Sequence, residues 1–364
     1  MTRFGPVGML DWARSVPASA ECDLAQTAVP PVAWRDLGVD AERLARCGAS
    51  GDEPQRDLIA LLAARHRAPH DAIALVSGNT QAAFCALAPH VGPGDEVIVE
   101  APTYPPLVDL VRALGADAIA LPRAASSGFA PDPDDLRERL SPRTAAVVLT
   151  DLHNPSGVHL DAARIDALLD VVEGHSRAFL FVDEVYLEFD PSPHPPTAYR
   201  PGRRVVVARS VTKAFGLGAL RCGWLVGAPD VVARCRAARD YVQGYVSPVL
   251  ALACAFALAT DVERRAAAAA RVRDGYARVA RGLAAIDGVA LVEPHAAAPA
   301  VCFPRLHASD ATRICDELLA RGVAVAPGAL FGAPAHVRLA CAAAPAAIDA
   351  GMAVLAALLR PPAA

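Results

Sequence analysis

The chain has 364 residues, of which 54% are hydrophobic and 20% charged, so it is long enough for a large globular domain with a smaller companion and too apolar to be disordered. Its formal net charge of −4 offers no basic surface for nucleic acid or an anionic membrane. Nine cysteines without a C-x-x-C pair indicate reduced, buried thiols of a cytoplasmic protein rather than disulfides or a zinc site.

Short β-rich runs alternate with amphipathic stretches through the middle of the chain. The runs predict strands at residues 72–77, 96–100, 117–122, 145–150, 178–184, 204–210 and 223–227. Apolar residues at three- and four-residue spacing predict helices at 80–91, 105–115, 133–140 and 161–175. We therefore expect an α/β fold with a large, mostly parallel seven-stranded sheet covered by helices.

The two ends of the chain do not continue this alternation. After Ala/Arg-rich helices at 250–285, the pattern predicts a strand at 300–304, a helix at 310–322 and a strand at 336–342, which is typical of a smaller α+β domain. We expect an N-terminal arm (1–45) packing on the small domain, a large domain (46–245) and the small C-terminal domain (246–364). The uncharged run Tyr241–Thr260 contains Gly244 and Pro248 and favours a buried helix over a membrane span.

Polar residues follow several of the predicted strands, where ligands bind in open parallel sheets. The small-residue turn at Gly78, Asn79 and Thr80 precedes a helix and could bind an anion or simply cap that helix. Tyr104 follows the next strand, where a packing role is equally compatible, and the Asn154-Pro-Ser-Gly sequence could be a plain turn. Asp183 and Tyr186 follow a strongly apolar strand, where a carboxylate needs a cationic partner.

Lys213 is the only lysine among the 35 basic residues of the chain, and it follows the strand that ends at Ser210. Arginine serves charge and hydrogen bonding everywhere else, including Arg221, but a guanidinium is a poor nucleophile, whereas a primary amine can form a Schiff base. An amine, a carboxylate, an aromatic ring, a phenol and an anion site together suit pyridoxal 5′-phosphate. Ser210 to Lys213 also matches the S-x-x-K pattern of serine acyl-enzymes, but their K-T-G element needs a second lysine.

The chain resembles the fold-type I pyridoxal-phosphate enzymes and, within them, the class I and II aminotransferases. The resemblance covers nearly the whole chain and is strongest in the sequences DLHNPSG (151–157), VDEVYLEF (182–189) and SVTKAFGLGALRCGW (210–224). It implies an aspartate-aminotransferase-like fold and a homodimer with shared active sites. It also implies an amino-group transfer from an amino acid to a 2-oxo acid.

The resemblance further implies a role for each matching residue. Lys213 would form the Schiff base and move the proton, and Asp183 would pair with the pyridine nitrogen. Asn154 and Tyr186 would hydrogen-bond the O3′ of the cofactor, Tyr104 would stack on its ring, and Arg338 would bind the substrate carboxylate, next to Asn154. The phosphate would be held by Gly78, Asn79, Thr80, Ser210 and Arg221.

One departure from the family concerns Cys47, which stands where a tyrosine often reaches the phosphate of the partner subunit. Two other functions stay open. The residues 237–248 loosely resemble enzymes that cyclise or oxidise arginine derivatives in natural-product pathways, so a pyridoxal-phosphate-dependent elimination or cyclisation is the alternative to transamination. A non-catalytic binding module is the third possibility, and the side chain of the substrate is not predicted.

Overall fold

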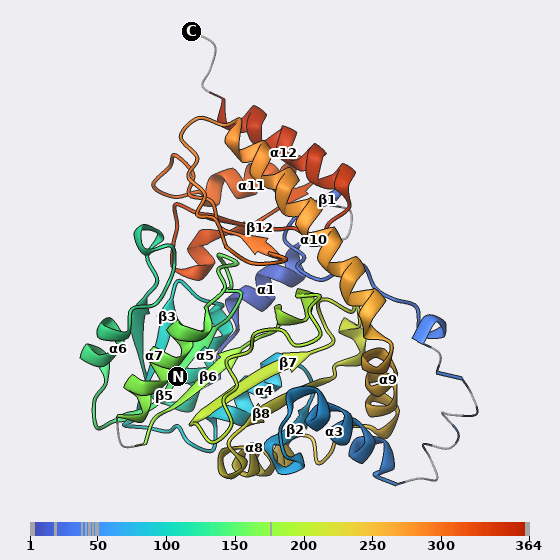
Figure 1. Ribbon diagram of the computed structural model, residues 1–364. Helices are drawn as coiled ribbons and strands as arrows, with labels where there is room; N and C mark the ends of the chain where they lie inside the picture. The colour runs from blue at the N-terminus through green and yellow to red at the C-terminus, as the bar shows by residue number, and fades with distance from the viewer. Residues whose placement is uncertain are drawn as a thin grey trace.

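The computed structural model describes residues 4–17, 20–37, 39–40, 42, 45, 47, 51–174 and 177–360. A large sheet with its helices lies below a smaller group of elements formed mainly by the C-terminal part of the chain, and the long helix α10 (Asp261–Ala284) runs along one side of both (Figure 1). The ends of the predicted arm and tail, and residue 175 of the predicted helix 161–175, lie outside the described residues.

The large sheet has seven strands in the order β2-β8-β7-β6-β5-β3-β4. All neighbouring strands pair in parallel except β8, which is antiparallel to both β2 and β7. The seven predicted strands and the mostly parallel sheet are therefore confirmed. Their bounds are β2 (Ile73–Val76), β3 (Glu96–Ala101), β4 (Asp117–Pro122), β5 (Thr144–Thr150), β6 (Phe179–Asp183), β7 (Val205–Ser210) and β8 (Gly223–Gly227).

Helices cover both faces of this sheet, because its central strands are buried along their whole length and have no water-facing side. One face packs against α3 (Glu53–His66), α6 (Pro133–Arg139), α7 (Ala162–Glu173) and α9 (Pro248–Ala259). The other face packs against α4 (Asn79–Leu87), α5 (Pro105–Leu114) and α8 (Pro229–Val242). Helix α3 was not predicted from the sequence.

The smaller part of the molecule has its own core. Strands β9 (Val301–Cys302), β12 (Val337–Ala340) and β11 (Ala326–Pro327) form an antiparallel sheet, with α11 (Thr312–Ala320), α12 (Pro345–Leu359) and the second half of α10 around it. The N-terminal segment joins this part through β1 (Cys22–Asp23), which pairs in parallel with β10 (Val323–Ala324). Helix α1 (Gly8–Ser15) lies between the two parts (Figure 1).

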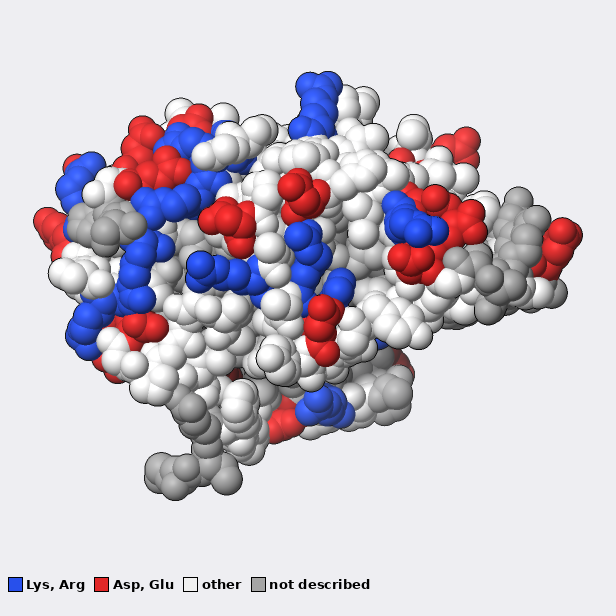
Figure 2. All heavy atoms as spheres, turned by 90° about the horizontal axis from the view of Figure 1, so that it is seen from below, with Lys and Arg blue, Asp and Glu red and all other residues white. Residues whose placement is uncertain are grey.

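The uncharged run 241–260 contains the end of α8 and the twelve-residue helix α9. Among the described residues, no helix is both long enough and apolar enough to span a bilayer. On the face seen from below, basic and acidic side chains are interspersed among uncharged ones (Figure 2). That face therefore carries no broad surface of a single charge.

Candidate active site

A cavity of about 790 Å³ lies at the carboxyl ends of the sheet strands, between the sheet, α1, and the small domain. It brings together residues that are far apart in the sequence and that come from both parts of the molecule. Of the predicted site residues, ten line this cavity: Asn79, Thr80, Tyr104, Asn154, Asp183, Tyr186, Ser210, Lys213, Arg221 and Arg338. Gly78 does not line it but adjoins Arg221.

Lys213 projects into the cavity from the loop that follows β7. The loop is held against the N-terminal segment, since Val29 N donates to Lys213 O at 3.1 Å and Gly216 (φ +64°) leaves no space for a Cβ beside Pro30 O. Within the described residues, no hydrogen bond or ion pair engages the Lys213 amine. Burial lowers its pKa to about 8, and the charge of Arg338 adds to this effect. An appreciable fraction of the amine is therefore unprotonated near neutral pH.

Asp183 is the last residue of β6, a strand whose five residues are all buried. Its Oδ1 accepts hydrogen bonds from Asn79 Nδ2 at 2.6 Å and from Val185 N at 3.0 Å. Burial raises the pKa of Asp183 to about 6, and the bond from Asn79 opposes this rise. No described residue donates to Oδ2, so one oxygen of a buried carboxylate remains available to a protonated nitrogen.

An anion cradle lies where β2 turns into α4. Gly78 has a φ of +81°, and a Cβ at this position would lie 2.6 Å from Arg221 Nη2. Arg221 donates to Ser77 O at 3.3 Å, which holds its guanidinium beside the first turn of α4. The free backbone N–H groups of that turn, a permanent cation and the Ser210 hydroxyl make a site that fits a phosphate group.

Arg338 on β12 reaches the same cavity from the small domain and is only 4% exposed. Its Nη1 donates to Asn154 Oδ1 at 3.1 Å and its Nη2 to Ala25 O at 2.9 Å, while its buried Nε has no partner among the described residues. Burial lowers the Arg338 pKa, which reflects a guanidinium that lacks a carboxylate partner. The arrangement suits a bound carboxylate.

Two phenols complete the wall of the cavity. Burial raises the pKa of Tyr104 to about 12 and also raises that of Tyr186, whose hydroxyl is hydrogen-bonded to Thr27. Both phenols therefore stay protonated and can donate hydrogen bonds at neutral pH.

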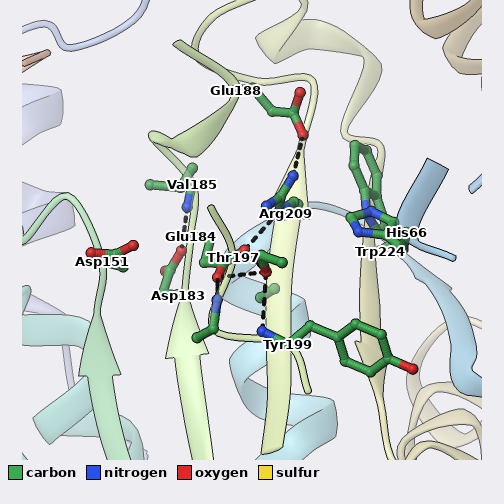
Figure 3. A network of polar contacts seen from close by, with 12 residues as sticks. His66, Asp151, Asp183, Glu184, Val185, Glu188, Thr197, Tyr199, Arg209 and Trp224 are labelled. Carbon is green, nitrogen blue, oxygen red and sulfur yellow. Dashed lines mark hydrogen bonds and ion pairs between the residues drawn. The ribbon is translucent and has the colours of Figure 1, made fainter. Parts of the chain in front are cut away.

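A buried ion network lies on the opposite face of the strands that carry Asp183 and Ser210 (Figure 3). Arg209 Nε contacts Glu184 Oε2 at 2.7 Å and its Nη1 contacts Glu188 Oε1 at 3.2 Å. Glu184 also accepts from Ala198 N at 2.6 Å. Burial opposes ionisation of Glu188, but Arg65 and Arg209 outweigh it and lower its pKa to about 2. The network therefore joins the ends of β6 and β7 directly behind the cavity.

The sequence pointed to the N-terminal arm as a source of substrate contacts but identified none of its residues. Asp23, Ala25, Gln26 and Thr27 all line the cavity, although no motif marks them. No sequence pattern identifies these residues, because β1 has only two residues and is too short to show a period. Cys47 is buried and is not among the residues that line the cavity. Among the described residues, no cluster of His, Cys, Asp or Glu side chains could hold a metal ion.

Comparison with known proteins gives consistent similarities. The family model for aminotransferase class I and II matches residues 19–353. The chain is 34% identical to the capreomycidine synthase of Streptomyces vinaceus, over 90% of this chain and 87% of that protein. It is 31% identical to a probable N-succinyldiaminopimelate aminotransferase of Mycobacterium tuberculosis, over 78% and 74% of the two chains. A pyridoxal-phosphate-dependent aminotransferase from Streptococcus suis has a similar structure, with a TM-score of 0.86 at 22% identity over 98% of each chain.

Proposed function

The chain belongs to the class I and II aminotransferase family and is a pyridoxal-phosphate-dependent aminotransferase with an aspartate-aminotransferase-like fold, and we propose that Lys213 carries its cofactor. The observation that carries this proposal is the pairing in one cavity of an amine with a lowered pKa and a carboxylate with an open oxygen. Because Lys213 is the only lysine, no other side chain of this protein can supply a primary amine.

The cavity fits the cofactor at each of its polar groups. The space beside Gly78 that a Cβ would fill, together with Arg221 and Ser210, accepts the phosphate. Asp183 Oδ2 would accept a hydrogen bond from the protonated ring nitrogen, Tyr186 and Asn154 would bind the ring hydroxyl, and Tyr104 would cover the ring. Bound pyridoxal 5′-phosphate supplies a protonated ring that withdraws electrons from the substrate Cα.

The remaining chemistry falls to the residues of the chain. Arg338 and Asn154 hold the substrate α-carboxylate, which orients the Cα–H bond toward Lys213. The Lys213 amine, with a pKa near 8, takes the proton from Cα and returns it as a general acid.

A single-turnover experiment tests this function. The purified holoprotein is mixed with one amino acid at a time, and the products are separated. Formation of pyridoxamine phosphate together with a 2-oxo acid is the expected result for at least one amino acid. If no amino acid converts the cofactor, the assignment of transamination to this site is wrong.

A second candidate function is favoured by the 34% identity to capreomycidine synthase. In that case the same proton abstraction at Cα would lead to elimination or ring closure on an arginine-like amino acid. The single-turnover experiment separates the two functions, because elimination or cyclisation gives ammonia or a cyclised product and leaves no pyridoxamine phosphate.

The proposal also includes the oligomeric state and the cellular compartment of the protein. We infer a homodimer with shared active sites, which is supported by exposed aromatic side chains at the end of α8 and in the segment that follows it, where Tyr241 is 94% and Tyr245 65% exposed. Light scattering tests this: a monomer at micromolar concentration would exclude it. The nine free, buried cysteines support a reducing, cytoplasmic location.

The domain boundaries are also a proposal, with an arm at 1–45, a large domain at 46–245 and a small domain at 246–364. Helices α9 and α10 would connect the domains, since α9 packs in the core of the large sheet and Val279 on α10 packs in that of the small sheet.

A further inference from the structure

Acidic groups remain in the cavity after the cofactor and the α-carboxylate are placed. Beyond the residues given a role above, the charged side chains of its described wall are Asp23, Asp109, Asp151 and Arg112. Asp151 has partners, since its Oδ1 accepts from Leu152 N at 2.8 Å and its Oδ2 lies 3.0 Å from His159 Nδ1. Asp109 lies on α5 within the electrostatic reach of Arg112. Asp23 differs from Asp109 in that two backbone N–H groups hold its carboxylate in place.

The Asp23 carboxylate has a fixed position and no ion-pair contact among the described residues, and the one described cation that acts on it electrostatically is Arg338. Its strand β1 is paired with β10, and its Oδ1 accepts from Ala25 N at 2.9 Å and Gln26 N at 3.0 Å. None of the described residues forms an ion pair with Asp23, and no described donor binds its Oδ2. The same turn presents Ala25 O to Arg338, so the free oxygen belongs to the segment that borders the carboxylate-binding arginine.

A second cavity of about 580 Å³ borders the first at Asp23, Gln26, Thr212 and Lys213. Its remaining wall is mostly apolar and comes from residues 28–32, 216–220 and 342–344. Besides Lys213, the cation described in the wall of this second cavity is Arg271, whose Nε donates to Ala342 O at 2.5 Å. Asp23 and Lys213 therefore lie in the walls of both cavities, and the second cavity offers mostly apolar surface beside them.

The geometry points to Asp23 as a specificity-determining residue that binds the cationic end of a basic amino-acid side chain. This inference rests on the proposed function, which places the substrate amine at Lys213 and its carboxylate at Arg338. Because Arg338 is then occupied by the substrate carboxylate, a guanidinium or ammonium group on the side chain supplies the ion-pair contact that Asp23 lacks. A second carboxylate on the substrate finds no matching partner, because Arg112 is exposed on α5.

Binding of unreactive analogues tests the inference without turnover. The probes are the arginine and lysine analogues that lack the α-amino group, with hexanoate as the neutral acid, and isothermal titration calorimetry on the holoprotein gives the dissociation constants. We expect at least one cationic acid to bind about 10-fold more tightly than hexanoate, as is typical of a charge-assisted hydrogen bond. The two cationic probes distinguish a guanidinium site from an ammonium site.

The matched variant is Asp23→Asn, whose amide oxygen can still accept the two N–H groups of the turn. It is expected to reduce the preference for the cationic acid to about equal binding. The control Asp109→Asn removes another cavity carboxylate and should leave the preference intact. If Asp23→Asn does not fold, Asp23→Ser, whose hydroxyl also accepts from the turn, replaces it.

Equal binding of cationic and neutral acids by the wild-type protein, or a preference that survives at Asp23→Asn, overturns the inference. Its failure is distinct from failure of the proposed function. A protein that converts only neutral amino acids keeps the function and loses the Asp23 site. A protein that binds cationic acids through Asp23 but converts no amino acid keeps the site and loses the function.

Discussion

Asn79 Nδ2 donates a hydrogen bond of 2.6 Å to Asp183 Oδ1, although the two residues are 104 positions apart in the chain. The bond joins the first residue of α4, in the anion cradle, to the last residue of β6. It therefore connects the group proposed to hold the cofactor phosphate with the group proposed to hold the ring nitrogen. It also stabilises the ionised form of a carboxylate that burial would otherwise neutralise.

The first prediction concerns Asn79→Ala. Loss of the hydrogen bond raises the pKa of Asp183 above its present value of about 6. Only the ionised carboxylate attracts a protonated ring nitrogen. The pH at which acidification has removed half of the cofactor affinity, the midpoint, should therefore rise. Dissociation constants of the apoprotein for pyridoxal 5′-phosphate, measured between about pH 5 and pH 8, give the midpoint. In the control Thr80→Ala the midpoint should stay in place, and an unmoved midpoint in Asn79→Ala contradicts the role of the bond.

The second prediction uses a pair of glycines with left-handed backbones, Gly78 (φ +81°) and Gly94 (φ +88°). Alanine at either position strains the backbone by about 1 kcal/mol. A Cβ at Gly78 also displaces Arg221, whereas a Cβ at Gly94 meets nothing within 4 Å. Gly78→Ala should therefore weaken cofactor binding by roughly 10-fold or more, and Gly94→Ala should not. Equilibrium dialysis measures both, and equal losses would contradict the placement of the phosphate.

The third prediction concerns Arg338→Met, which removes the guanidinium proposed to bind the substrate carboxylate. The value of kcat/KM should fall by about 100-fold or more, because a charged hydrogen-bond partner is lost in a buried site. The control is Arg313→Met on α11, where the arginine side chain is 90% exposed. Steady-state kinetics with any accepted amino acid compare them. A similar kcat/KM in both variants would show that the carboxylate binds elsewhere.

The fourth prediction concerns the buried pair of Arg209 and Glu184. Arg209, which is 2% exposed, is the one described cation that contacts Glu184, whereas Glu188 also contacts Arg65 and Arg265. Arg209→Met therefore leaves the buried Glu184 without a cation and should lower the free energy of unfolding by about 3–5 kcal/mol. Arg137→Met, at a pair whose side chains are 58% and 81% exposed, should cost about 1 kcal/mol or less.

Urea denaturation of the apoproteins measures both changes. Adding Glu184→Gln to Arg209→Met should restore part of the lost stability, because it removes the buried charge that has lost its cation. A double variant less stable than Arg209→Met would contradict this account of the pair.

The sequence was most informative for helices and strands that can be recognised from their own residues alone. Runs such as VVVARS (205–210) are apolar enough to identify a buried strand, and the rule that ligands bind at the carboxyl ends of parallel strands places Asp183 and Lys213 near one another. The role of Arg338 was predicted only from the family resemblance, because this residue lies in the small sheet and no local pattern identifies it.

Features that depend on the pairing of distant segments escaped prediction. β1 has only two residues, too few to show a period, so the contribution of Asp23 and Ala25 to the cavity could not be foreseen. Arg209 and Glu184 are single charges in apolar runs, and their contact follows only from the neighbouring positions of β6 and β7. The antiparallel position of β8 also depends on the whole sheet order.

The central claim is that Lys213 binds pyridoxal 5′-phosphate covalently. Borohydride reduction of the holoprotein, followed by proteolysis and mass spectrometry, locates the attachment site. Because Lys213 is the only lysine, the phosphopyridoxyl group is predicted on the peptide that contains it, and Lys213→Ala should yield no labelled internal peptide. A cofactor that binds tightly but leaves the Lys213 peptide unmodified after reduction would contradict the account.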